Sequence, residues 1–105
     1  MPDTKEAATD VFSDALAAQE PPGHWPAPLR ALFLAEKGDW NGAHELVQHS
    51  EDRASAWVHA HLHRAEGDDW NARYWYRQAG EAEGAGDLPA ERLSIAGALM
   101  VRGGL

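Results

Sequence analysis

One stretch, from Ala54 to Gly80, limits the fold of this chain more than any other. Two segments rich in alanine, histidine and aromatic residues flank the run Glu66-Gly67-Asp68-Asp69, where a glycine can end one helix and an aspartate can cap the next. The stretch holds three of the five tryptophans, both tyrosines and three of the six histidines. It predicts a helical hairpin with aromatic side chains inside and a polar histidine stripe along one edge.

The N-terminal part predicts one helix followed by a break. Residues 1–20 read as a helix that is free to fray, capped by Asp3, with Val11 and Phe12 on its apolar stripe. The segment from 20 to 28 holds four prolines and cannot continue a helix. Trp25 lies in this break and is expected to fold back over the core.

The rest of the chain predicts more helices. Residues 28–80 are expected to form two helical hairpins. Gly38 and Gly67 are expected to end the first helix of each hairpin, Gly38 at the position where a left-handed residue stops a helix. A flexible acidic loop at 81–86 leads to a C-terminal helix at 87–102. We therefore expect one all-α domain, residues 1–105, with five helices: two antiparallel hairpins flanked by an N-terminal and a C-terminal helix.

The composition narrows the choice of partners and compartment. The 105 residues include no cysteine, which excludes disulfides and thiolate metal sites. The formal net charge of −8 argues against nucleic acid or an anionic membrane as partner. The N-terminus lacks the apolar segment of a signal peptide, and no apolar run approaches the roughly 20 residues of a spanning helix. A cytoplasmic location is expected.

The two hairpins repeat a pattern. Gly38-Asp39 aligns with Gly67-Asp68 at an offset of 29 residues, without gaps. The small residues Ala43 and Ala72 then align, and four positions later a bulky residue follows in each unit. A period of this size is typical of helical repeats.

This pattern resembles the tetratricopeptide repeat, in which a Gly-Asp turn joins two helices and small and bulky residues follow at these positions. The resemblance covers residues 28–80 and implies a fold of helical hairpins, and it does not indicate a ligand. The period is shorter than the family's 34 residues, the early Trp-Leu-Gly signature is missing, and only two units are present. The flanking helices are therefore expected to cap the pair. The runs AHELVQ, AWVHAHLHRAEGD and NARYWYRQAG also resemble a group of short bacterial proteins of uncharacterised function, which implies no activity.

Histidines supply the candidate metal ligands. His59 and His63 are four residues apart, so they share a helix face, and Glu66 continues the stripe. Counting back from a turn near residue 51 places His44 opposite them. The set His44, His59, His63 and Glu66 is a candidate site for Zn or Ni; the alternative is that these histidines are structural or face a partner. On a helix, His61 points away from the other two.

Aromatic and basic residues supply the candidate partner surface. Trp70, Arg73, Tyr74 and Arg77 are expected at the surface of the second hairpin, whereas Trp75 and Tyr76 are expected in the core. An exposed aromatic patch with arginine at its rim is typical of a protein interface.

No catalytic signature is present. The chain lacks a Ser/His/Asp order, a phosphate-binding glycine loop and a dinucleotide fingerprint, so an enzyme is not favoured and no cofactor is expected. The first hypothesis is an adaptor that binds a protein or peptide in a helical groove. The alternatives are a metal-binding or small-ligand-binding protein that uses the histidines, and a homodimer built on the Trp/Tyr face.

Overall fold

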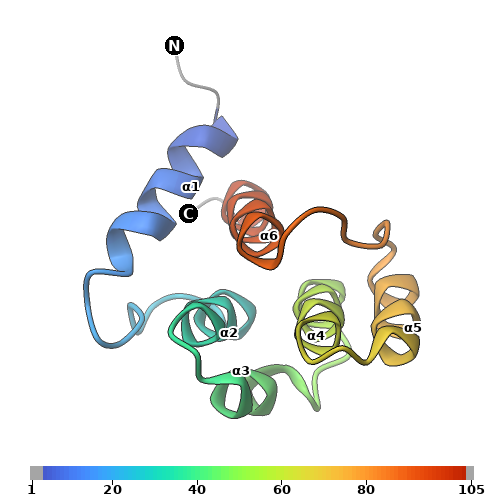
Figure 1. The fold of residues 1–105 in the computed structure, drawn as a ribbon. Helices are drawn as coiled ribbons and strands as arrows, with labels where there is room; N and C mark the ends of the chain where they lie inside the picture. The colour runs from blue at the N-terminus through green and yellow to red at the C-terminus, as the bar shows by residue number, and fades with distance from the viewer. Residues whose placement is uncertain (1–3, 104–105) are drawn as a thin grey trace.

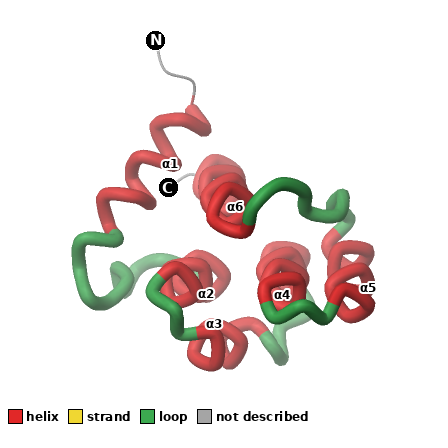
Figure 2. The backbone as a smooth tube through the Cα atoms, viewed as in Figure 1, coloured by secondary structure: helices red, strands yellow, loops and turns green. Residues whose placement is uncertain are grey.

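The computed structural model describes residues 4–103, and within them every regular element is a helix. These residues form six helices and no strand, arranged as in Figures 1 and 2. The helices are α1 (Thr4–Ala15), α2 (Ala27–Glu36), α3 (Trp40–Val47), α4 (Arg53–Ala65), α5 (Asp69–Ala79) and α6 (Leu88–Gly103). The all-α class is confirmed, but the expected count of five is wrong by one, because two hairpins and two flanking helices make six. Asp3, expected to cap the first helix, and Gly104, expected with Gly103 to end the last one, lie outside the described residues.

Helix α4 is the central element. Figure 1 shows it with α2, α3, α5 and α6 around it, and it packs against all four. Its buried residues lie on several sides, as expected for a covered helix. The polar stripe expected along one edge, which also includes Ser55 at the start of α4, is wrong in part, because Ser55 and His59 are buried.

Two similar turns build the two hairpins. Gly38 and Gly67 end their helices with φ of +85° and +83°, a region that glycine enters without steric penalty. The next residue caps the following helix: the Asp39 carboxylate accepts from the Gly42 amide at 2.9 Å, and Asp68 accepts from Asn71 at 3.3 Å. Each turn therefore reverses the chain and starts a new helix within three residues.

The positive φ of Gly67 gives a first prediction. Substitution Gly67→Ala places a Cβ at positive φ and is expected to lower the free energy of unfolding by about 1–2 kcal/mol. Gly23→Ala is the matched control, because Gly23 lies in open space and lacks a positive φ. Urea denaturation measures both, and equal effects of the two substitutions would contradict the assignment of Gly67 to a left-handed turn.

The terminal helices pack on one another. Figure 1 shows α1 from the side, crossing α6, while α6 lies over α2 and α4. Close approach occurs at Gly97, where an added Cβ would lie 2.6 Å from Thr9 Cγ2. The expectation that both flanking helices cap the hairpin pair is thus wrong for α1, which caps α6.

The N-terminal helix is held through Phe12, which is buried and stacks on Trp25 at 5.9 Å between ring centroids. Trp25 in turn meets the edge of Phe33, so its expected position over the core is confirmed. Val11, placed on the same apolar stripe from sequence, is 55% exposed, and that assignment is wrong. The two residues are adjacent, so a helix turns them about 100° apart.

None of the helices in residues 4–103 has both the length and the apolar character needed to cross a bilayer.

Candidate functional site

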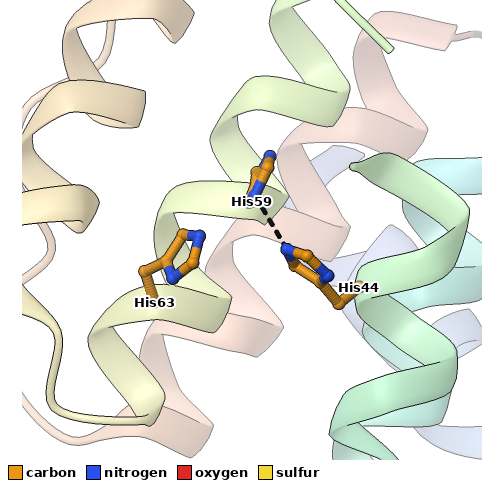
Figure 3. A group of neighbouring side chains, drawn as sticks. All are labelled: His44, His59 and His63. Carbon is orange, nitrogen blue, oxygen red and sulfur yellow. Dashed lines mark hydrogen bonds between the residues drawn. The ribbon is translucent and has the colours of Figure 1, made fainter. Parts of the chain in front are cut away.

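Three histidines from two helices meet on one side of α4. His44 extends from α3, and His59 and His63 from α4 (Figure 3). One ring nitrogen of each lies within 4.8 Å of the others, and the Nε2 atoms of His44 and His59 are 3.0 Å apart. The predicted juxtaposition of these three residues is present, because the turn before α4 lays α3 back along it.

Each of the three imidazole rings is held by a neighbour. Trp40 stacks on His44 with ring centroids 4.7 Å apart, and Trp75 stacks on His59 at 4.1 Å. Trp40 is itself fixed, since its indole N–H donates to the Leu62 carbonyl at 2.7 Å. The orientations of the first two rings therefore depend on tryptophans from α3 and α5.

His63 is held by Glu66, whose carboxylate lies 2.7 Å from Nδ1 of the ring. A proton on Nδ1 donates to this carboxylate and leaves Nε2 as a free lone pair. Glu66 was predicted as a ligand alongside the imidazoles. The structure places its carboxylate on the outer nitrogen of His63, where it orients the ring.

His59 carries a buried nitrogen without a partner. The residue is 4% exposed, and its Nδ1 has no hydrogen-bond partner among the described residues. If His59 donates from Nε2 to His44, the buried Nδ1 lone pair receives no donor; if it accepts at Nε2, a buried Nδ1–H has no acceptor. Neither neutral tautomer satisfies both nitrogens, and an unsatisfied buried polar group costs about 1–3 kcal/mol.

The cluster also favours neutral imidazoles. Burial, with smaller effects of His63 and His44, lowers the pKa of His59 from 6.5 to about 4. Burial and His63 likewise lower the pKa of His44. Neutral imidazole is the form that binds a metal ion, so the environment keeps these rings ready to act as ligands.

This pKa shift predicts acid sensitivity in metal-free protein. The unfolded chain takes up a proton on His59 below pH 6.5, whereas the folded chain resists it until about pH 4. The free energy of unfolding should therefore fall by about 3 kcal/mol as the pH drops from 6.5 to 4. Denaturation in EDTA at several pH values measures this, and His59→Gln should flatten the curve between pH 6.5 and 4.5. An unchanged slope in that variant would rule out His59 as the cause.

A second polar cluster, on the opposite side of α4, was missed from sequence. His61 is 0% exposed, and its Nδ1 donates to Glu91 of α6 at 2.6 Å while its Nε2 accepts from Arg92 at 3.2 Å. Tyr76 of α5 also donates to Glu91, and Arg64 donates to it at 3.1 Å. We call these residues, His61, Arg64, Tyr76, Glu91 and Arg92, the buried network.

The buried network ties α4, α5 and α6 together. Burial alone would raise the pKa of Glu91, but the hydrogen bonds from His61, Tyr76 and Arg64 lower it overall. Burial and Glu91 raise the pKa of Tyr76 above its usual 10.0. The loop at 81–86, expected to be flexible, is attached here, since the Gly86 carbonyl accepts from Arg64. Among the described residues, no buried side-chain nitrogen or oxygen of the network lacks a hydrogen-bond partner, so we assign the network a structural role.

The predicted partner residues lie on the surface of α5. Trp70 is 73% exposed and Tyr74 is 41% exposed, and Arg73 and Arg77 are exposed beside them. We call these four residues the α5 face. Tyr76 is buried, as expected, whereas Trp75 is only half-buried, because its ring covers His59 at the edge of the histidine cluster.

A separate groove lies at one end of the helices, with a volume of about 870 Å³. Its walls include Pro26, Leu29, Arg53, Trp57, Leu99 and Arg102. Arg102 lies over the Trp57 ring at 5.0 Å and pairs with Glu81 at 3.0 Å. The charge of this arginine is therefore already balanced within the chain.

Comparison with known proteins gives no relative: no protein-family model, curated protein or solved structure matches the chain.

Proposed function

We propose that the protein is a small interaction module that binds another protein through the α5 face. The exposure of Trp70 is the observation that carries this proposal. Tryptophan is highly buried on average, whereas Trp70 is 73% exposed, and exposed large apolar groups that form a patch mark interaction sites. Tryptophan, tyrosine and arginine are the residues most enriched at binding hot spots, and the α5 face consists of these three types.

The charge of the face indicates the kind of partner. Arg73 and Arg77 give the α5 face two exposed positive charges on a chain whose net charge is −8. Arg73 has an exposed acidic neighbour, Glu83, at 4.0 Å, a distance at which a surface pair is weak. A partner segment with apolar side chains for Trp70 and Tyr74 and carboxylates for the arginines fits best.

The arrangement of the helices favours a partner site on α5, at the outer edge of the molecule. We interpret the hairpins α2–α3 and α4–α5 as tetratricopeptide-like units, and the matching Gly38 and Gly67 turns support this. Helix α6 covers α2 and α4, so the face that these helices share is filled by the chain itself. Helix α5, at the opposite edge from α1, keeps an open side for a partner.

Site-specific crosslinking tests the proposal. A photo-crosslinking amino acid placed at position 70 in the protein's own cells should capture one defined partner, and the same group at position 11 should not. Val11 is the matched control because it is a large apolar residue, 55% exposed, on α1.

The dissociation constant for the captured partner then identifies the surface. Trp70→Ala is expected to weaken binding about 30-fold, the effect of a hot spot worth about 2 kcal/mol. Arg73→Glu, made on its own, should weaken the affinity for the partner more than Trp70→Ala does. Val11→Ala should leave the affinity unchanged. If Arg53→Glu in the end groove weakens binding and Trp70→Ala does not, the α5 face is the wrong surface. Capture of a second copy of the chain, with a dimer in light scattering, would replace the adaptor with a homodimer.

A further inference from the structure

We propose that His44, His59 and His63 bind one divalent transition-metal ion, with zinc as the ion of best fit. This inference is independent of the α5 face, since it depends on other residues. It rests on the convergence of the three imidazoles and on the neighbours that hold each ring.

The first step concerns the hydrogen bonds that the three imidazoles can form within the protein. Three imidazoles place one ring nitrogen each within 4.8 Å of the others, but a single hydrogen bond, between His44 and His59, joins them. The Glu66 carboxylate accepts a hydrogen bond from Nδ1–H of His63, so the lone pair of Nε2 is left for another group. Nitrogen lone pairs that point toward one another cannot form hydrogen bonds among themselves, because each needs a donor. A metal ion can bind several such lone pairs at once.

The second step concerns distance. Zinc binds histidine nitrogen at about 2.0–2.1 Å in a tetrahedral arrangement, which places two ligand nitrogens roughly 3.3 Å apart. The Nε2 atoms of His44 and His59 lie 3.0 Å apart, so a small rotation of either ring opens the pair to this spacing. His63 comes from the next turn of α4 and can complete a third position.

The third step concerns the surroundings of the ligands. Histidine ligands usually donate their second ring nitrogen to a carboxylate or carbonyl, which fixes the tautomer and the ring orientation. Glu66 does this for His63, while stacking on Trp40 and Trp75 fixes the other two rings. The rings are therefore positioned before any ion arrives, which lowers the cost of ordering them on binding.

The ligand set selects the class of metal. Three nitrogen ligands without thiolate suit zinc, nickel or copper, whereas magnesium and calcium require oxygen ligands. His44 and His63 are partly exposed, so a fourth position faces solvent and can take water or a donor from a ligand. A second group, His63, Glu66 and Asp68, is the weaker candidate, because Asp68 already caps α5.

Calorimetry on untagged, EDTA-treated protein tests the site with zinc chloride as the probe. One zinc ion should bind per chain, and sedimentation should show no zinc-dependent dimer. His44→Gln and His63→Gln should each weaken binding at least about 100-fold, and Glu66→Gln about 10-fold, the usual effect of losing an outer carboxylate. His49→Gln and His24→Gln are matched controls, since both histidines are exposed and lie outside the cluster.

Each result decides the matter. Circular dichroism without zinc should show that the variants stay folded; Glu66→Gln replaces no proposed zinc ligand, so it tests the site even if a histidine variant unfolds. The proposal is overturned if zinc does not bind at one ion per chain. It is equally overturned if the His49 or His24 variant loses binding while the His44 and His63 variants keep it, or if zinc joins two chains.

Discussion

Replacing Glu91 by alanine is expected to lower the free energy of unfolding by about 3–5 kcal/mol, the effect of removing one partner from a buried, hydrogen-bonded charge pair. The substitution leaves the Nδ1–H of His61 and the hydroxyl of Tyr76 without acceptors in the interior. It also leaves Arg64 with a half-buried charge and no carboxylate at 3.1 Å. Because the buried network joins α4, α5 and α6, the loss should appear in global unfolding rather than in local fraying.

Urea denaturation followed by circular dichroism measures this effect, with the midpoint and slope fitted separately. Glu83→Ala is the control, since Glu83 is exposed and makes one weak pair with Arg73; its effect should stay within about 0.5 kcal/mol. Gly84→Ala supplies an independent check, because its methyl group would lie 2.6 Å from the Tyr76 hydroxyl and still closer to the Glu91 carboxylate. A loss below about 1 kcal/mol for Glu91→Ala would show that the network does not carry the stability assigned to it.

The second large effect is expected at Phe12. Phe12→Ala should lower the free energy of unfolding by about 3 kcal/mol, because it leaves a cavity between α1, Trp25 and the core. Val11→Ala is a matched control on the neighbouring residue, which is mostly exposed, and it should change stability by less than about 0.5 kcal/mol.

Hydrogen exchange shows where Phe12→Ala acts. Amide protection in α1 should be largely lost, because α1 is attached through α6 and Trp25, while α4 should stay protected and lose no more than the fall in the free energy of unfolding. If wild-type α1 shows no protection, the helix frays as its sequence suggested and its packing on α6 is wrong.

The parts of the fold that follow local rules could be predicted from sequence. Gly38 and Gly67 end helices because they occupy positive φ, and Asp39 and Asp68 cap the next helices with their carboxylates. Both are short-range effects that residue type decides. The proximity of His44 and His59 could also be predicted from sequence. The helical rise and the position of the turn between the two helices determine which residues of α3 and α4 lie opposite each other.

The parts that depend on distant contacts could not be predicted. Nothing local distinguishes His61 from its neighbours on α4, and its partner Glu91 is 30 residues away on α6. Its burial depends on how the last helix docks, which periodicity does not determine. The same holds for α1, whose narrow apolar stripe suggested fraying although Phe12 is in the core.

Nuclear Overhauser contacts between aromatic side chains test the central claim most directly: the turns pack α3 and α5 against α4, so that both helices reach the three histidines. Cross-peaks are expected between the ring protons of His44 and His59, whose centroids are 4.8 Å apart, and between His59 and Trp75 at 4.1 Å. These contacts should appear in metal-free protein. Well-resolved His44 signals that show no contact with either α4 histidine would contradict the arrangement, and with it the proposed metal site.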